Sequence, residues 1–227
     1  IMREPVYGVI YGDLDGAYNA SAQKLKVFDW AGAEWVDAPK CRAIVDEVLA
    51  NPSSYWKYGS LHLRIKGDFD NVPLRVGTCG ENGTPSGSEG LVWASVSNYE
   101  TTMSLGDYLH SRGSGGHGQI IEGLLATGGN DSPCLFKMCD AERKKYPKYD
   151  SKGNRIEKNF VPNTWFKLAS NTIYGSFANR NGKHREMSGK WFNALVASSI
   201  TGAIRHAMWT VNEASDAYYN DTDSALT

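Results

Sequence analysis

The chain has 227 residues, of which 41% are hydrophobic, and its formal net charge at pH 7 is −1. A chain of this length and hydrophobic content can bury a core in one or two domains, which argues against extensive disorder. It contains no apolar run as long as a membrane span and no recognisable signal peptide. Its four cysteines, Cys41, Cys79, Cys134 and Cys139, lack the spacing of a zinc site and are predicted to be inert thiols in a reducing compartment.

The first part of the chain is predicted to form a strand over 4–13, which contains an apolar run, and then a helix over 16–25. A second helix is predicted to start after Asp37, a residue type that caps helices, with Pro39 in its first turn, and to end near Ala50. Four apolar residues would form its inward face: Ile44, Val45, Val48 and Leu49.

The middle of the chain alternates apolar and polar residues over 61–66, which predicts a half-buried strand with residues 72–76 as its hairpin partner. Another strand is predicted over 91–95 and a helix over 99–110. Glycine-rich stretches at 80–90 and 111–118 predict loops. We identify no chemistry in this middle region.

The last part of the chain is rich in helix formers. Two helices joined by a short loop are predicted over 138–149 and 161–180, and a long helix over 193–212. The long helix carries apolar residues at four-residue steps and many small residues, so it should pack closely under a sheet: Val196, Ile200, Ile204 and Met208. The predicted fold class is α+β.

Two aspartates, Asp221 and Asp223, stand one residue apart in a predicted tight hairpin over 219–224. Both carboxylates can converge around such a turn, and because like charges repel, the pair favours a bound hard cation such as Mg²⁺. Two such ions would clamp the attacking and leaving oxygens of a phosphoryl transfer. A solvated turn is the alternative, since Asp also bonds its own backbone in turns.

Two further segments carry polar residues in suggestive places. Asp13 stands at the end of the first predicted strand, where the turn into a helix can hold phosphate oxygens on its N–H groups. Lys167, Asn171 and Tyr174 are spaced i, i+4 and i+7 and therefore share one helix face, which suits the phosphates and base of a nucleotide. An ordinary amphipathic helix is the alternative for this second segment.

Positive charge is concentrated in one stretch. Residues 137–167 contain nine Lys or Arg and four Asp or Glu, which is a local excess of five positive charges. A basic patch of this kind fits a polyanion, because nucleic-acid binding depends on a patch and not on the total charge. A solvated loop around 151–154 is the alternative for some of these lysines.

Taken in order, these three segments resemble the motifs of the family B DNA polymerases. Asp13, Gly16 and Tyr18 match the first motif, D-x-x-S/G-x-Y. Residues 167–175 match the second, K-x-x-x-N-S-x-Y-G, with Thr172 where serine is usual, and residues 219–224 match the third, Y-x-D-T-D-S, without a substitution. The helix before the third motif, over 196–205, is also similar to that of the family.

The resemblance implies a metal site and a phosphate site. Asp13 and Asp223 would bind two Mg²⁺ ions, and Asp221 would support them as a closer or outer ligand, so these three aspartates would be catalytic. The backbone from Leu14 through Asp15 and Gly16 to Ala17 would hold the β- and γ-phosphates. Two residues depart from the family pattern without removing an assigned role: Asn19 stands where many members have proline, and Asp15 adds an acid at a variable position.

The resemblance also implies how the nucleotide would be held. Tyr18 would lie under the sugar and exclude a 2′-hydroxyl, and Lys167 would reach the triphosphate. Arg143 is our first choice for a second cation, before Arg155 and Lys158. Asn171, Tyr174 and Gly175 would line the nascent base pair, Gly175 by permitting close backbone approach.

The domain arrangement follows from the same resemblance. Residues 1–135 would be the first part of the palm, with an inserted strand-rich region at about 55–130 similar to that of protein-primed phage and linear-plasmid polymerases. Residues 136–182 would be short fingers, and 183–227 the second part of the palm. The exonuclease and thumb are expected to lie outside this chain, and we therefore expect the isolated chain to be inactive.

The implied activity is template-directed DNA synthesis, in which a nucleotidyl group passes from a dNTP to a primer 3′-hydroxyl by a two-metal mechanism. The implied partners are a DNA primer–template, dNTPs and, as in protein-primed members, a terminal protein primer, with no membrane partner. The implied location is intracellular, in the cytoplasm of a host cell that carries a virus or mobile element.

Two other classes stay open. A non-catalytic polymerase-like module that binds nucleic acid is expected to lose its metal carboxylates, whereas Asp13, Asp221 and Asp223 are all present. Reverse transcriptases and RNA polymerases carry adjacent aspartates in this hairpin, whereas Thr222 separates the two aspartates here.

Overall fold

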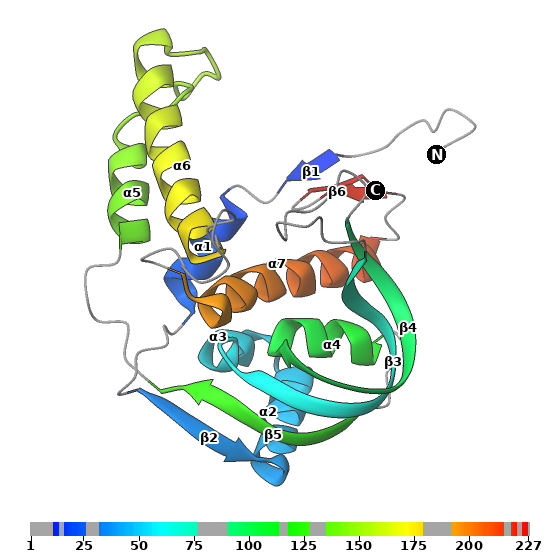
Figure 1. Ribbon diagram of the computed structural model, residues 1–227. Helices are drawn as coiled ribbons and strands as arrows, with labels where there is room; N and C mark the ends of the chain where they lie inside the picture. Colours follow the sequence, from blue (N-terminus) through cyan, green and yellow to red (C-terminus); the bar gives the residue numbers. More distant parts are fainter. Residues whose placement is uncertain are drawn as a thin grey trace, which may run out of the picture.

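The computed structural model describes residues 11–13, 16–25, 32–76, 90–113, 118–127, 135–178, 192–215, 219–221 and 224–226. Within them the chain forms one three-stranded and one four-stranded antiparallel sheet, with helices packed against both (Figure 1). The predicted α+β class is confirmed, with an antiparallel sheet backed by helices. No helix among these residues is long and apolar enough to cross a membrane.

The small sheet pairs a strand from the first part of the chain with two strands from its last part. Its strand order is β1 (Tyr11–Asp13), β7 (Ser224–Leu226), β6 (Tyr219–Asp221), so β7 is the central strand. β1 confirms the end of the predicted first strand, while residues 4–10 lie outside the described part of the chain. The predicted first helix is also present as α1 (Ala17–Lys24).

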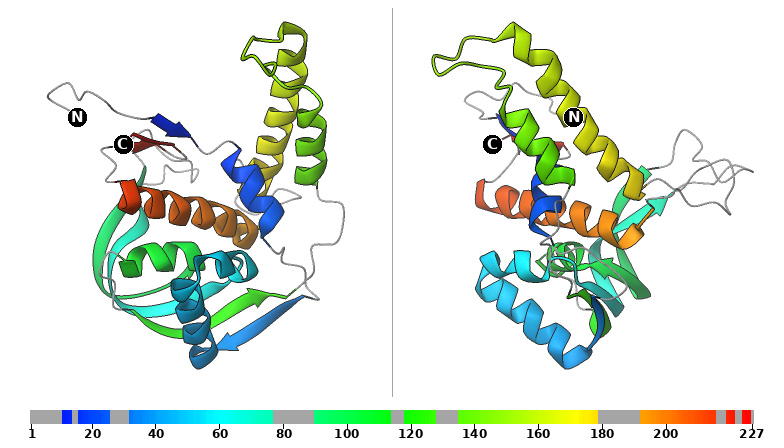
Figure 2. Two further views of the ribbon diagram at one scale, coloured as in Figure 1. Left: turned by 180° about the vertical axis from the view of Figure 1, so that it is seen from behind. Right: turned by 90° about the vertical axis from the view of Figure 1, so that its left-hand side faces the viewer.

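The long helix α7 (Ala194–Ser215) lies between the small sheet and the rest of the molecule (Figures 1 and 2). The sequence predicts it over 193–212, and the four apolar residues spaced along it are all buried, as expected: Val196, Ile200, Ile204 and Met208. The helix packs against α1 and against α4 (Leu105–Gly113). It therefore connects the small sheet to the inserted region of the chain.

The four-stranded sheet has the order β2 (Ala33–Asp37), β5 (Gln119–Ala126), β3 (His62–Val76), β4 (Gly90–Ser104). The long β3–β4 ribbon curves around α4 (Figure 1). The strands β2 and β5 were not predicted. β2 pairs along its full length with residues 122–126 of β5, with Ala33 opposite Ala126 and Asp37 opposite Glu122.

Two predictions for the inserted region are wrong. Residues 72–76 are not the hairpin partner of the strand before them but continue it as β3, with register shifts between Gly67 and Val72. Residues 99–104 are not the start of a helix but the end of β4, because they pair with 62–67 of β3. The helix begins at Leu105 instead. In both cases long-range strand pairing outweighs the local pattern.

The helix α2 (Ala38–Ala50) begins as predicted. The Asp37 carboxylate accepts a hydrogen bond of 2.9 Å from the Lys40 backbone N–H, which caps the helix. Ile44, Val45 and Val48 are buried, but Leu49 is 48% exposed, so its predicted inward position is wrong. Leu49 follows Val48 by one residue, about 100° around the helix, and so lies off the buried face. A 3₁₀ turn, η1 (Pro52–Ser54), and a short helix, α3 (Tyr55–Tyr58), follow.

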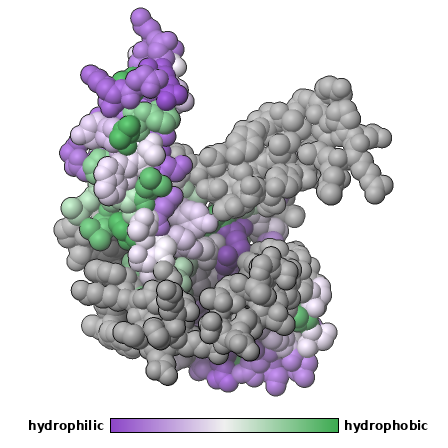
Figure 3. All heavy atoms as spheres, turned by 45° about the horizontal axis from the view of Figure 1, so that its top comes forward, coloured by the Kyte–Doolittle hydropathy of each residue, from purple (hydrophilic) through white to green (hydrophobic). Residues whose placement is uncertain are grey.

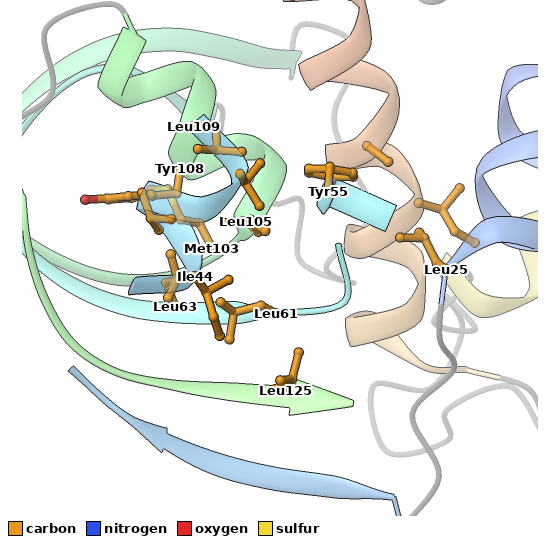
Figure 4. Close-up of a cluster of buried hydrophobic side chains, with 14 of the residues drawn as sticks. Leu25, Ile44, Tyr55, Leu61, Leu63, Met103, Leu105, Tyr108, Leu109 and Leu125 are labelled. Carbon is orange, nitrogen blue, oxygen red and sulfur yellow. The ribbon is translucent and has the colours of Figure 1, made fainter. Parts of the chain in front are cut away.

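The main core lies between α4, α2 and the concave face of the four-stranded sheet (Figure 4). Leu61, Leu63 and Ile65 of the predicted alternating strand are fully buried, and each such side chain contributes about 1.5–3 kcal/mol. His62, which the alternation places on the polar face, is also buried and lies 2.5 Å from the Ser198 hydroxyl on α7. Burial lowers the pKa of His62 to about 4, so it is neutral at pH 7.

The two helices predicted near 138–149 and 161–180 form an antiparallel pair, α5 (Leu135–Lys144) and α6 (Glu157–Ala178), that stands out from the body (Figures 1 and 2). The first ends earlier than predicted, because Pro147 cannot extend it. Residues 145–156 instead form a turn in which the Asp150 carboxylate accepts 2.8 Å hydrogen bonds from the N–H groups of Lys152 and Asn154. Hydrophobic side chains interrupt the polar surface of this helix pair (Figure 3).

Candidate active site

The small sheet brings the first and third sequence motifs together. Asp13 and Asp221 both stand opposite Ser224 of the central strand, one on each side of it. The backbones of these two aspartates are therefore roughly 10 Å apart, twice the usual strand spacing. Residues 208 positions apart in sequence thus stand in one row of the sheet.

The metal site itself remains a prediction. Asp223 and Thr222 lie outside the described residues, and nothing is described of the Asp13 and Asp221 side chains. Among the side chains that the structure does describe, no three His, Cys, Asp or Glu residues gather as a metal site. The chemistry of the predicted donor set fits the predicted ion, because carboxylate oxygens suit Mg²⁺.

The start of α1 has the backbone that the predicted phosphate site needs. Gly16 is in the left-handed conformation, with φ 63°, which favours glycine, and its carbonyl accepts the first helical hydrogen bond, 2.8 Å from the Ala20 nitrogen. The N–H groups of the first turn that follows have no partner within the helix. Leu14 and Asp15, which complete the predicted loop, lie outside the described residues.

Arg143 of α5 reaches this same turn. A β-carbon placed on Gly16 would lie 3.5 Å from the Arg143 Nη1 atom, so the guanidinium is beside the start of α1. The two other candidate cations lie elsewhere on the helix pair. Arg155 pairs with Glu157 at 2.9 Å and lies over the Phe160 ring, and Lys158 is exposed on the first turn of α6. The geometry therefore favours Arg143 as the second cation.

Tyr18 of α1 and Tyr174 of α6 are in contact. Their ring centroids are 4.5 Å apart, with the rings tilted by 42°. Both side chains are half-buried. Burial raises the pKa of Tyr174, the neighbouring Tyr18 adds to this rise, and the positive charge of Arg205 opposes it. The first and second motifs thus meet through an aromatic pair.

The remaining residues of the second motif are accessible. Lys167 and Asn171 are exposed on α6, and Gly175 has nothing within 4 Å of the place where a β-carbon would stand. Lys167, Asn171 and Tyr174 share one face of the helix, as the spacing predicts. The side chains of this face that carry the motif are therefore open to solvent or half-buried.

Known structures of one polymerase share this architecture. No protein-family model matches the sequence, and no curated protein matches it significantly. Phi29 DNA polymerase in a ternary complex with primer-template DNA and incoming nucleotides matches with a TM-score of 0.55 and 17% identity, over 96% of this chain. Phi29 DNA polymerase in a post-translocation binary complex matches with a TM-score of 0.51, the same identity and the same share of this chain.

The chain has the fold of part of a DNA polymerase. It spans 38% of the length of the phi29 polymerase chain in both structures. The resemblance that the motifs suggest is therefore supported at the level of the fold, and the polymerase fold places α1, α6 and α7 around one region of the molecule.

One partly buried ion pair in this fold is not indicated by the sequence. Arg205 of α7 contacts Asp107 of α4 with its Nε atom 2.6 Å from Oδ1. The sequence places Arg205 in a helix similar to that of the family but gives it no role, and Asp107 falls in the region where no chemistry is evident. No signal in a single sequence links two residues 98 positions apart.

Proposed function

We propose that the chain forms the palm and fingers of a family B DNA polymerase, similar to protein-primed members, that transfers a nucleotidyl group from a dNTP to a primer 3′-hydroxyl. The observation that carries this proposal is the meeting of Tyr18, Tyr174 and Arg143 around the start of α1. These residues come from separate parts of the sequence, and the fold that unites them is similar to that of a DNA polymerase. The partners would be a DNA primer–template and dNTPs; a terminal protein primer is implied only by the similarity to protein-primed members.

The chain's own residues would bind and orient the substrate. Arg143 and Lys167 would bind the triphosphate by charge, and the N–H groups at the start of α1 would hold its oxygens. Tyr18 and Tyr174 would pack against the sugar and the nascent base pair. Asp13 and Asp223, supported by Asp221, would hold two Mg²⁺ ions, which supply charge neutralisation for the attacking and leaving oxygens when bound.

A primer-extension assay with the full-length protein tests this function directly. We expect incorporation of deoxynucleotides on a DNA template in the presence of Mg²⁺. Incorporation on an RNA template in preference to DNA would instead indicate a reverse transcriptase, and preference for ribonucleotides an RNA polymerase. Binding of primer–template without any incorporation would indicate a non-catalytic module and would overturn the proposal.

Replacing Tyr18 by Val should weaken the rejection of ribonucleotides. The ring would exclude a 2′-hydroxyl by steric overlap, and the smaller side chain leaves room for it. We expect the ratio of kcat/KM for a ribonucleotide to that for a deoxyribonucleotide to rise by about tenfold or more, which is typical of a lost pocket contact. Tyr149→Val, at an exposed tyrosine in the turn between α5 and α6, is the control. An unchanged ratio in the Tyr18 variant would make Tyr18 a packing residue only.

Replacing Gly175 by Ala should raise the stability of the protein but lower its activity. A β-carbon there meets no protein atom within 4 Å, so the helix should gain roughly 0.5–1 kcal/mol in the free energy of unfolding. The same methyl group would occupy space next to the nascent base pair, and we expect kcat/KM for dNTPs to fall by about tenfold. Ser176→Ala, at the next residue, is the control. Unchanged kcat/KM in the Gly175 variant would place the base pair elsewhere.

A further inference from the structure

The ion pair between Arg205 and Asp107 has two contacts. The Arg205 Nε atom donates to Asp107 Oδ1 at 2.6 Å, and its Nη2 atom donates to Asp107 Oδ2 at 2.9 Å. The Asp107 side chain is 6% exposed and that of Arg205 is 26% exposed. Burial opposes the charge on Arg205, but the hydrogen bonds and charge of Asp107 outweigh it and raise the pKa of Arg205. Arg205 is therefore charged at neutral pH, and the bidentate contact with Asp107 fixes the plane of the guanidinium.

Asp107 is itself held in place by the end of β4. The Ser104 hydroxyl donates to Asp107 Oδ2 at 2.7 Å and accepts a 3.3 Å hydrogen bond from the Asp107 backbone N–H. Arg205 also donates to the Thr201 hydroxyl one turn earlier on α7, at 3.3 Å. The carboxylate and the guanidinium thus each have a second partner that restricts their position.

The guanidinium of Arg205 is also close to the aromatic pair. Helix α7, which carries it, packs against both α1 and α6, the helices that carry Tyr18 and Tyr174. Both tyrosines contribute to the raised pKa of Arg205, after the larger effects of burial and of Asp107. The three side chains therefore lie within electrostatic reach of one another. The Arg205 side chain is thus fixed at one end by Asp107, on a helix that packs against the two helices carrying the tyrosines.

We propose that Asp107 is a positioning residue for the nucleotide, because it holds Arg205 where its guanidinium supports the Tyr18–Tyr174 pair. This inference rests on the proposed function. It gives the inserted region a role in substrate selection, through a residue that touches neither the substrate nor a metal. Loss of the Asp107 charge would free the guanidinium to rotate, and the electrostatic surroundings of the two rings would then change.

The variant Asp107→Asn in the full-length protein tests this role. Asparagine has the same shape, but its amide nitrogen cannot accept a hydrogen bond from Arg205 or Ser104. We expect KM for dNTPs to rise by about tenfold, equivalent to 1.4 kcal/mol, and discrimination against ribonucleotides to fall, while kcat stays within a factor of about three. Glu100→Gln, which removes the exposed 2.7 Å contact with Arg64 on the same sheet, is the matched control and should change none of these values.

A second readout does not depend on activity. With 3-fluorotyrosine placed at position 174, the fluorine NMR signal reports the surroundings of that ring. We expect Asp107→Asn to shift or broaden this signal and Glu100→Gln to leave it unchanged. If the wild-type protein incorporates no nucleotide, the proposed function fails, yet this measurement still decides whether Asp107 acts on Tyr174.

The outcomes that overturn the proposal are specific. An unchanged fluorine signal in Asp107→Asn shows that the ion pair does not act on the tyrosine. A changed signal with unchanged KM and discrimination in an active enzyme shows that the ion pair is structural only. If Asp107→Asn does not fold, Ser104→Ala takes its place. It removes both hydrogen bonds between the Ser104 hydroxyl and Asp107 but keeps the Asp107 charge, and it should give smaller changes in the same direction.

Discussion

Replacing Asp223 by Asn is expected to abolish nucleotide incorporation by the full-length protein. Asp223 precedes Ser224, the residue that stands opposite both Asp13 and Asp221 in the small sheet. If the three aspartates hold the metal ions, the loss of one carboxylate removes several kcal/mol of transition-state stabilisation. Each 1.4 kcal/mol is a factor of ten, so we expect kcat to fall by about three orders of magnitude or more. Single-turnover incorporation with Mg²⁺ measures the effect.

The matched control is Asp46→Asn, at an exposed aspartate on α2, a helix that lies on the other side of α7 from the small sheet (Figure 1). It makes the same change of charge and should leave incorporation unchanged. Titration of Mn²⁺ into both variants, followed by electron paramagnetic resonance, should show weaker binding in Asp223→Asn alone. Incorporation within about tenfold of the wild type in Asp223→Asn would contradict the assignment of Asp223 as a metal ligand. The loss of a ligand shared by both ions should lower the rate by much more than about tenfold.

Replacing Gly106 by Ala is expected to cause a large loss of stability. Helices α4 and α7 approach each other so closely there that a β-carbon on Gly106 would overlap the backbone carbonyl of Gly202 and lie 2.8 Å from the Tyr55 hydroxyl. The blocking atoms are mostly backbone, so the two helices must move apart. We expect the free energy of unfolding to fall by about 2–3 kcal/mol, at the upper end of the usual cost of overpacking. Chemical denaturation of this chain measures the change.

The comparison variant is Gly175→Ala, which also adds one methyl group to a helix but where the structure offers open space. Its stability should rise, so the two substitutions should have effects of opposite sign. A neutral or stabilising effect of Gly106→Ala would contradict the close approach of α4 and α7 at this position. The contact matters for function as well, because the same two helices carry Asp107 and Arg205.

Much of the fold could be predicted because its signals are local. The Asp37 cap and Pro39 mark the start of α2, and the four-residue steps of apolar side chains mark α7, since capping and amphipathicity depend on residues within a few turns. The alternation over 61–66 located the buried side of β3. In the same way the second motif placed Lys167, Asn171 and Tyr174 on one helix face, because the helix repeat alone determines that.

The long-range contacts could not be predicted from these signals. Residues 99–104 became strand because β3 was available as a partner, and pairing with a distant strand outweighs a local helical pattern. His62 became buried because α7 covers it with Ser198. A single sequence shows where apolar and polar residues alternate, but it does not show which distant elements will pack against them.

The sequence by itself determined α1, α2, α6 and α7, the alternating strand and the three motifs, since each depends on residues close together in the chain. Only the tertiary structure brought Arg143 to Gly16 and Tyr18 to Tyr174. It also decided that Asp107 pairs with Arg205, because an ion pair between distant residues depends on how α4 packs against α7 and leaves no trace in local spacing.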